Sequence, residues 1–70
     1  MVNLAAHITG TVVKIEKKPG DPVSAGESVV ILESMKMEMP LESERAGKVK
    51  EIRCREGQAV NEGDVLVVLE

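Results

Sequence analysis

Short aliphatic runs separated by glycine-containing turns recur along this 70-residue chain. The runs are rich in Val and Ile, and their lengths suit short strands but are too short for ordinary helices. Residues 28–32 and 65–69 are nearly continuous aliphatic segments, as expected of strands that are covered on both faces. The pattern therefore predicts an all-β domain, a small antiparallel sandwich or barrel.

An internal repeat covers most of the chain. Residues 10–33 and 47–70 align without a gap at an offset of 37, and the matched positions include glycines and aliphatic residues alike. Neither copy has enough apolar surface to stand alone, and each exposes strand edges that the other can cover. We therefore expect residues 1–70 to fold as one domain with internal two-fold pseudo-symmetry.

Each copy is punctuated in the same way. The segment KPGD at 18–21 suits a type II turn, with Pro at the second position and Gly supplying a positive φ at the third. Residues 55–58 keep the Gly of this turn, and a second Gly-centred turn follows in each copy, at 25–27 and 62–64. These turns mark where the strands end.

The apolar spacing breaks strict alternation once in each copy. The breaks lie at Val12…Ile15 in the first copy and at Val49…Ile52 in the second. We interpret each as a bulge or a sharp twist, at a point where the strand crosses between sheets.

The segment that joins the copies, residues 34–46, contains no glycine. The aliphatic run 29–41 is too long for one strand of so small a domain, since most strands have about 5–6 residues. The chain must therefore reverse near Met35-Lys36-Met37, which would place Lys36 at an exposed tip. A tight hairpin turn favours Asn-Gly or Asp-Gly, whereas this segment offers Met and Lys. A local rule that is broken at one place in an otherwise regular chain indicates function.

A plain strand is the alternative for this segment. Met35, Met37 and Met39 would then point one way as soft core filler, and Lys36 would be an ordinary surface charge. The repeat favours the reversal, because the chain must return to begin the second copy at Gly47.

Lys36 is the only basic residue between Glu33 and Glu44. A lysine amine is protonated at neutral pH, and surrounding carboxylates favour that charged form. Lys36 is therefore a poor nucleophile by itself, and a separate enzyme would have to remove its proton before acylating it. These residues indicate a site of modification rather than a catalytic centre.

The composition excludes several classes of protein. The chain has no Phe, Tyr or Trp and a formal net charge of -3, so it has neither a stacking platform nor a basic footprint for nucleic acid. No apolar run approaches the roughly 20 residues of a membrane span. A single cysteine forms no intramolecular disulfide and no zinc staple, and a free thiol fits a reducing compartment.

Two other residues have chemical potential. Cys54 lies between Arg53 and Arg55, whose charges could lower the pKa of the thiol; a small strand residue without a role is the simpler interpretation. His7 is the only histidine, and it has no nucleophile or carboxylate partner in motif spacing. We expect neither to be catalytic.

At Met35-Lys36-Met37 the sequence resembles the biotinyl/lipoyl carrier domains. The resemblance is closest to the biotin carboxyl carrier domain, whose attachment motif is Met-Lys-Met, and to short stand-alone biotin/lipoyl attachment proteins, since little chain is left for a leader or linker. The family's paired G-D-x-V-x-x-G segments appear at 20–26 and, with Gln58 in place of Asp, at 57–63. The resemblance implies a flattened barrel, or barrel-sandwich hybrid, of two four-stranded antiparallel sheets with an attachment hairpin at 34–39.

The resemblance also implies a carrier that is not itself an enzyme. Lys36 would be biotinylated by a biotin protein ligase and would shuttle carboxybiotin between the sites of a biotin carboxylase and a carboxyltransferase. Met35 and Met37 would flank the site as recognition residues, and Glu33 and Glu38 would orient the ligase by charge complementarity. We expect a cytoplasmic domain, monomeric when isolated, that has no nucleic-acid or membrane partner.

Two other functions remain open. In a lipoyl carrier, or a dual acceptor of biotin and lipoate, the lysine would carry lipoate; lipoyl domains typically have Asp before the lysine and lack the flanking methionines, so Met35 and Met37 favour biotin. An unmodified barrel used only for protein assembly would never be acylated, and Lys36→Ala would be silent. One departure from the family lies at 6–10, where AHITG replaces a segment like Ala-Pro-Met-Pro-Gly.

Overall fold

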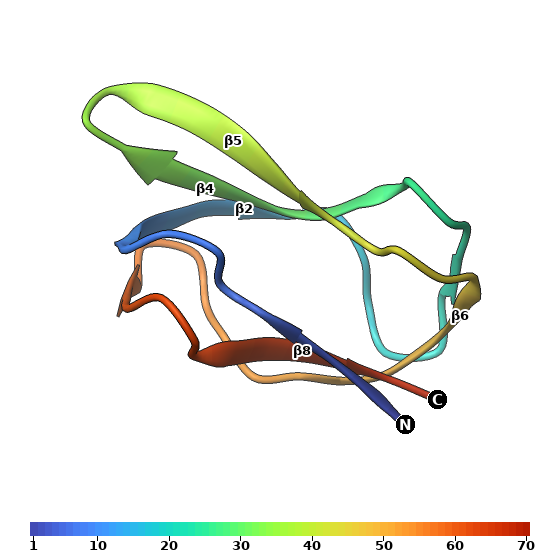
Figure 1. Cartoon of the computed structure of the whole chain (residues 1–70). Coiled ribbons are helices and arrows are strands. Elements are labelled where there is room, and N and C mark those ends of the chain that lie inside the picture. The colour runs from blue at the N-terminus through green and yellow to red at the C-terminus, as the bar shows by residue number, and fades with distance from the viewer.

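The computed structural model describes residues 1–70 and contains eight strands and no helix (Figure 1). Every strand pair is antiparallel, and the strands form two four-stranded sheets, with orders β1-β8-β6-β3 and β5-β4-β2-β7. The predicted flattened barrel of two four-stranded antiparallel sheets is confirmed. The strands are β1 (Val2–Ala5), β2 (Gly10–Ile15), β3 (Pro22–Val23), β4 (Ser28–Ser34), β5 (Met37–Glu42), β6 (Gly47–Ile52), β7 (Ala59–Val60) and β8 (Val65–Leu69).

The two sheets are related by the offset of 37 residues. Strands β2, β3 and β4 begin 37 residues before β6, β7 and β8, and the same offset maps β1 onto the second part of β5. Applied to every strand, it converts one sheet order into the other. The first pair of strands is hard to find from the sequence, because Leu4 and Leu41 are its only identical residues.

Four glycine-centred turns close with the same two hydrogen bonds. In each, the N–H of the fourth residue donates to the first carbonyl at 3.0–3.1 Å, and the first N–H donates to a side-chain oxygen of the fourth residue at 2.9–3.0 Å. The glycine at the third position has a φ of 84° to 96°. Gln58 accepts through its amide oxygen in the place of a carboxylate, so this turn tolerates the change from Asp. The turns are 18–21, 24–27, 55–58 and 61–64.

Backbone hydrogen bonds from these turns join the two halves of the repeat. The N–H of Gly20 donates to the carbonyl of Val49 at 2.8 Å, and the N–H of Gly57 donates to the carbonyl of Val12 at 2.7 Å. Both valines are buried in the core, at strand positions equivalent by the repeat. The backbone of one copy therefore depends on the strands of the other, as expected for one cooperative unit.

A single aliphatic core fills the space between the sheets. It comprises 14 buried residues, and no aromatic ring contributes to it. Close packing of β-branched and leucine side chains stabilises the domain by removing apolar surface from water, about 25 cal/mol for each Å². The core residues are Leu4, Ala6, Val12, Val23, Val29, Val30, Leu32, Leu41, Val49, Cys54, Val60, Leu66, Val67 and Leu69.

Bulges occur at both predicted breaks in the alternation. The register shifts between Val12 and Lys14 on β2, and between Val49 and Glu51 on β6, so that one extra residue is accommodated in each strand. The expectation that these strands cross between sheets is wrong. Each keeps its partners within one sheet, because the bulge bends the strand and restores the pairing one residue later.

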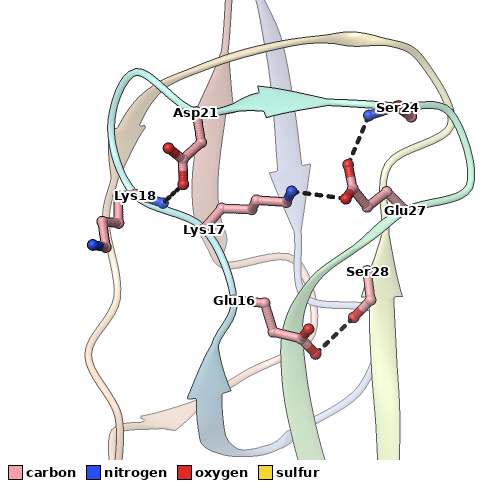
Figure 2. Close-up of polar contacts among 7 residues, drawn as sticks. All are labelled: Glu16, Lys17, Lys18, Asp21, Ser24, Glu27 and Ser28. Atoms are coloured by element: carbon pink, nitrogen blue, oxygen red, sulfur yellow. Dashed lines mark hydrogen bonds and ion pairs between the residues drawn. The ribbon is translucent and has the colours of Figure 1, made fainter.

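A polar cluster joins β4 to the segment after β2 (Figure 2). The Lys17 Nζ donates to the Glu27 Oε2 at 2.7 Å, and the Ser24 N–H donates to the Glu27 Oε1 at 2.9 Å. The Ser28 hydroxyl donates to the Glu16 Oε1 at 3.4 Å. One carboxylate thus caps a turn and also binds a lysine whose side chain is only 18% exposed.

Candidate functional site

The hairpin of β4 and β5 ends in a two-residue turn. Ser34 pairs with Met37, which leaves Met35 and Lys36 as the central residues of the turn. Their φ values are 54° and 65°, the positive values that a type I′ turn requires at both positions. The predicted reversal is confirmed, and the plain-strand alternative is wrong. The hairpin is longer than the predicted 34–39, because its strands span 28–34 and 37–42.

This turn is conformationally strained. Met35 and Lys36 are the only residues other than glycine with a positive φ in the chain. The left-handed region costs an L-residue with a Cβ about 1–2 kcal/mol. Asn-Gly would relieve that cost, so the sequence here departs from what hairpin stability favours. Strain of this kind persists where the surrounding structure enforces it, and it clusters at functional sites.

The side chain of Lys36 is exposed and forms no hydrogen bond or ion pair. The turn lies at one end of a molecule measuring 30 × 19 × 18 Å, and the two chain termini lie together at the other end (Figure 1). No other residue of the chain binds the Lys36 amine. An exposed, unpartnered amine at the tip of a hairpin is open to a second protein.

The two methionines beside Lys36 expose much apolar surface. Met35 is 92% exposed and Met37 is 61% exposed. Met39 is half-buried on the same face of β5 as Met37, whereas Met35 lies in the turn, so the three methionines do not point one way. Exposed thioethers contribute nothing to the core, and flexible methionine surfaces commonly serve recognition.

Glu33 and Glu38 face each other across the hairpin. Their Cα atoms are paired in the register of β4 and β5, and both side chains are exposed. Like charges directly opposite each other destabilise an antiparallel pair. Neither carboxylate forms an ion pair with Lys36 or any other base. The fold therefore places two exposed carboxylates, neither of them in an ion pair, at the residue pair next to the one that closes the turn.

Gly10 also supports this site, although no sequence motif pointed to it. Gly10 begins β2, beside the pairing of Thr11 with Glu33, and so lies beneath the base of the hairpin. The signal for it was the repeat, in which Gly10 and Gly47 are a matched pair, each followed by a strand.

Neither His7 nor Cys54 joins the hairpin site. His7 is exposed and forms no hydrogen bond. Cys54 is buried in the core as a free thiol, and burial raises the pKa of the Cys54 thiol. The alternative that Arg53 and Arg55 lower this pKa is therefore wrong, because desolvation of the thiolate prevails. Cys54 lies after the end of β6 and not in a strand as the simpler interpretation had it. No three potential metal-ligating side chains lie together, and no helix is long and apolar enough to cross a membrane.

A flattened β-barrel with a lysine at the tip of one protruding hairpin defines the class of carrier domains. A family model described as "Biotin-requiring enzyme" matches residues 2–69. The chain belongs to this biotin/lipoyl family, which confirms the resemblance of its sequence.

The named proteins that this chain is similar to include both a carboxylase and a lipoyl domain. The chain is 46% identical to the Biotin/lipoyl attachment protein of Bacillus subtilis (strain 168), over 97% of this chain and 93% of that protein. Its fold matches the urea carboxylase of Kluyveromyces lactis with a TM-score of 0.93 and 36% identity, over 99% of this chain and 6% of that one. It also matches the lipoyl domain of the 2-oxoglutarate dehydrogenase complex from Azotobacter vinelandii, with a TM-score of 0.75 and 37% identity, over 89% of this chain and 78% of that one.

Proposed function

We propose that Lys36 is the attachment site of biotin and that the chain is a carrier, with no catalytic site of its own. The observation that carries this proposal is the exposed, unpartnered amine of Lys36 in a strained turn between two exposed methionines. The similarity to an attachment protein and to a domain of a carboxylase supports it.

The residues of the hairpin fit a covalently attached group. A biotin protein ligase would take a proton from the Lys36 amine, which then forms an amide with the carboxyl carbon of biotin as the activating group leaves. Met35 and Met37 would give the ligase adaptable apolar contacts, and Glu33 and Glu38 would orient it by charge. When bound, biotin would supply the atom that carries a carboxyl group from a biotin carboxylase to a carboxyltransferase.

The function of the chain in this scheme is positioning. The hairpin would hold the attached group away from the barrel, and tethering would make each transfer intramolecular, with a high effective concentration. We also propose a monomer in a reducing, cytoplasmic compartment, since Cys54 is a free thiol and no disulfide supports the fold.

Lipoate is the second candidate for the same lysine. The match to a lipoyl domain over most of both chains supports it. The flanking pair Met35 and Met37 favours biotin, because the attachment motif of the biotin carboxyl carrier domain, which this sequence resembles, is Met-Lys-Met.

The test is the intact mass of the chain after expression with an active biotin ligase. We expect the native chain and a Lys18→Arg control to gain one biotinyl group, and Lys36→Arg to gain none. Lys18 is a suitable control because it is also an exposed lysine at a turn. A lipoyl-sized gain at Lys36 would move the function to acyl transfer, and no gain in a folded chain would reject the proposal.

A further inference from the structure

The outer face of the sheet that bears the hairpin carries an apolar strip. The register aligns Lys14, Ile31 and Pro40 in one row across β2, β4 and β5. The residues on either side of Ile31 are fully buried, so its own side chain faces outward and is half-buried. Val13, the extra residue of the β2 bulge, is 38% exposed beside this row. We call Val13, Ile31 and Pro40 the apolar strip.

The pseudo-symmetric face of the other sheet is polar at two of the three equivalent positions. The offset of 37 residues matches Val13 with Lys50 and Pro40 with Asn3, and both of these polar residues are exposed. The third match, Val68, is only 3% exposed. The same backbone therefore accepts polar side chains at two of the three positions, so the fold does not require an apolar residue at Val13 or at Pro40.

No other role accounts for the exposure of Val13. Only four large hydrophobic residues of the chain are exposed, and two of them, Met35 and Met37, belong to the hairpin site. The third is Met1, whose Sδ lies 3.0 Å from the Nζ of Lys50. Val13 is the fourth, and it neither fills the core nor flanks Lys36.

Carboxylates border the apolar strip on β4 and β5, whereas the exposed Lys14 lies beside Val13 at its β2 end. Glu38 and Glu42 alternate with Pro40 along β5, so all three lie on the outer face. Glu33 lies beyond Ile31 on β4 in the same way. None of these carboxylates forms an ion pair in the structure. An apolar side chain with Arg and Lys on the side that faces β4 and β5 would complement this surface in both shape and charge.

We propose that the apolar strip and its bordering carboxylates are the docking surface for the biotin carboxylase that acts on the group carried by Lys36. This inference rests on the proposed function. The partner would present an apolar side chain with Arg and Lys on the side that faces β4 and β5. Pro40 lies four residues from Lys36, about 13 Å along an extended strand. A partner docked on the strip therefore leaves the turn free, so the tethered group can enter the partner's site.

The ligase gives a contrasting case. It must reach the Lys36 amine itself and so engages the tip, whereas the strip lies on the side of the hairpin. Substituting Val13 should therefore impair the carboxylase reaction and leave ligation unchanged. Val13→Lys is the natural choice, because Lys50 already occupies the equivalent bulge. Lys50→Val is the matched control.

The experiment uses the fully biotinylated chain and the biotin carboxylase subunit of the same organism. The rate at which this carboxylase carboxylates the attached biotin, with ATP, is measured against the concentration of the carrier. We expect Val13→Lys to raise KM about tenfold with kcat unchanged, a typical loss for a residue of a docking interface. Lys50→Val should stay within about twofold of the native chain. Added salt should raise the KM of the native chain, because charge attraction is screened.

Three results would overturn the proposal: an unchanged KM for Val13→Lys, an equal loss for Lys50→Val, or an equal slowing of ligation. If Val13→Lys fails to fold, Val13→Thr, which keeps the branched side-chain shape and adds a polar hydroxyl, replaces it. If the native chain takes up no biotin, the proposed function fails by itself. Docking is then tested by NMR titration of the unmodified chain with the same carboxylase. Shifts centred on Val13 and Ile31 support the surface, and shifts elsewhere or none reject it.

Discussion

The backbone carbonyl oxygen of Glu33 lies against Gly10, inside the space that a Cβ on Gly10 would fill. Glu33 is three residues before Lys36, so this contact supports the base of the hairpin. In the other half, a Cβ on Gly47 would stand 3.2 Å from the carbonyl oxygen of Glu70, a tight distance that a small shift relieves. The two matched glycines are thus under different constraints.

Gly10→Ala should therefore be more harmful than Gly47→Ala. The added methyl group at position 10 must displace the backbone of β4, and overpacking of this kind costs about 1–3 kcal/mol of unfolding free energy. Urea unfolding of both variants and the native chain measures the difference. Equal losses would show that Gly10 has no special part in holding the hairpin.

Met35→Asn should stabilise the domain. Asn tolerates the left-handed region better than Met, so relief of strain in the turn should add up to about 1 kcal/mol. For a domain of this size, that gain raises Tm by about 4–8 °C. Thermal unfolding followed by circular dichroism measures it. Acylation of Lys36 should slow, because the ligase loses an exposed thioether.

Met37→Asn is the control for this variant. Met37 is also an exposed methionine beside Lys36, but it begins β5, outside the left-handed region. It should give no gain in Tm. A gain as large as that of Met35→Asn would mean that the effect comes from removing an exposed apolar side chain and not from backbone strain.

The Lys17–Glu27 pair should make stability depend on pH in the acid range. The hydrogen bond from Lys17, followed by the one from the Ser24 backbone, lowers the pKa of Glu27 below its ordinary value. A carboxyl whose pKa is lower in the folded state stabilises the fold above its unfolded pKa, and this stabilisation is lost as pH falls through the folded value. Glu27→Gln should therefore lose less stability than the native chain between pH 6 and pH 3, about the range in which carboxylates titrate.

A double-mutant cycle separates the two contacts of Glu27. Lys17→Gln removes the larger cause of the shift and should reduce the acid-dependent loss, while the bond from Ser24 remains. Glu27→Gln on the Lys17→Gln background should then change the pH dependence less than it does in the native chain. Fully additive effects would contradict the coupling.

Pro40 should protect the free edge of β5 against pairing with another chain. Ser34 and Met37 close the turn as a hydrogen-bonded pair, so alternation leaves the backbone of Pro40 facing outward from the sheet. Proline has no N–H to donate at such an edge. Pro40→Thr restores a donor there and should increase self-association, measured by sedimentation at increasing concentration. Pro22→Thr is the control, because the edge strand β3 has only two residues; self-association of both variants would argue against this role.

Local rules in the sequence predicted much of this molecule. Glycine and proline at fixed positions identified the turns, and broken alternation identified both bulges, because each depends on neighbouring residues alone. The reversal at Met35 and Lys36 followed from length, since so long an aliphatic run cannot be one short strand. The burial of Cys54 could not be predicted in this way, because it depends on residues that are distant in sequence.

By itself, the sequence determined the all-β class, the two-fold repeat, the carrier family and the candidate lysine. The fold class and the repeat follow from the spacing of glycines and aliphatic residues along one chain, whereas the family and the lysine came from the resemblance carried by the Met-Lys-Met motif and the paired turn segments. Only the tertiary structure decided that Gly10 supports Glu33, that Glu33 faces Glu38, and that Val13 shares an outer face with Pro40. The reason is physical: contacts between strands depend on register and on the bulges that shift it, and a shift of one residue moves a side chain to the opposite face.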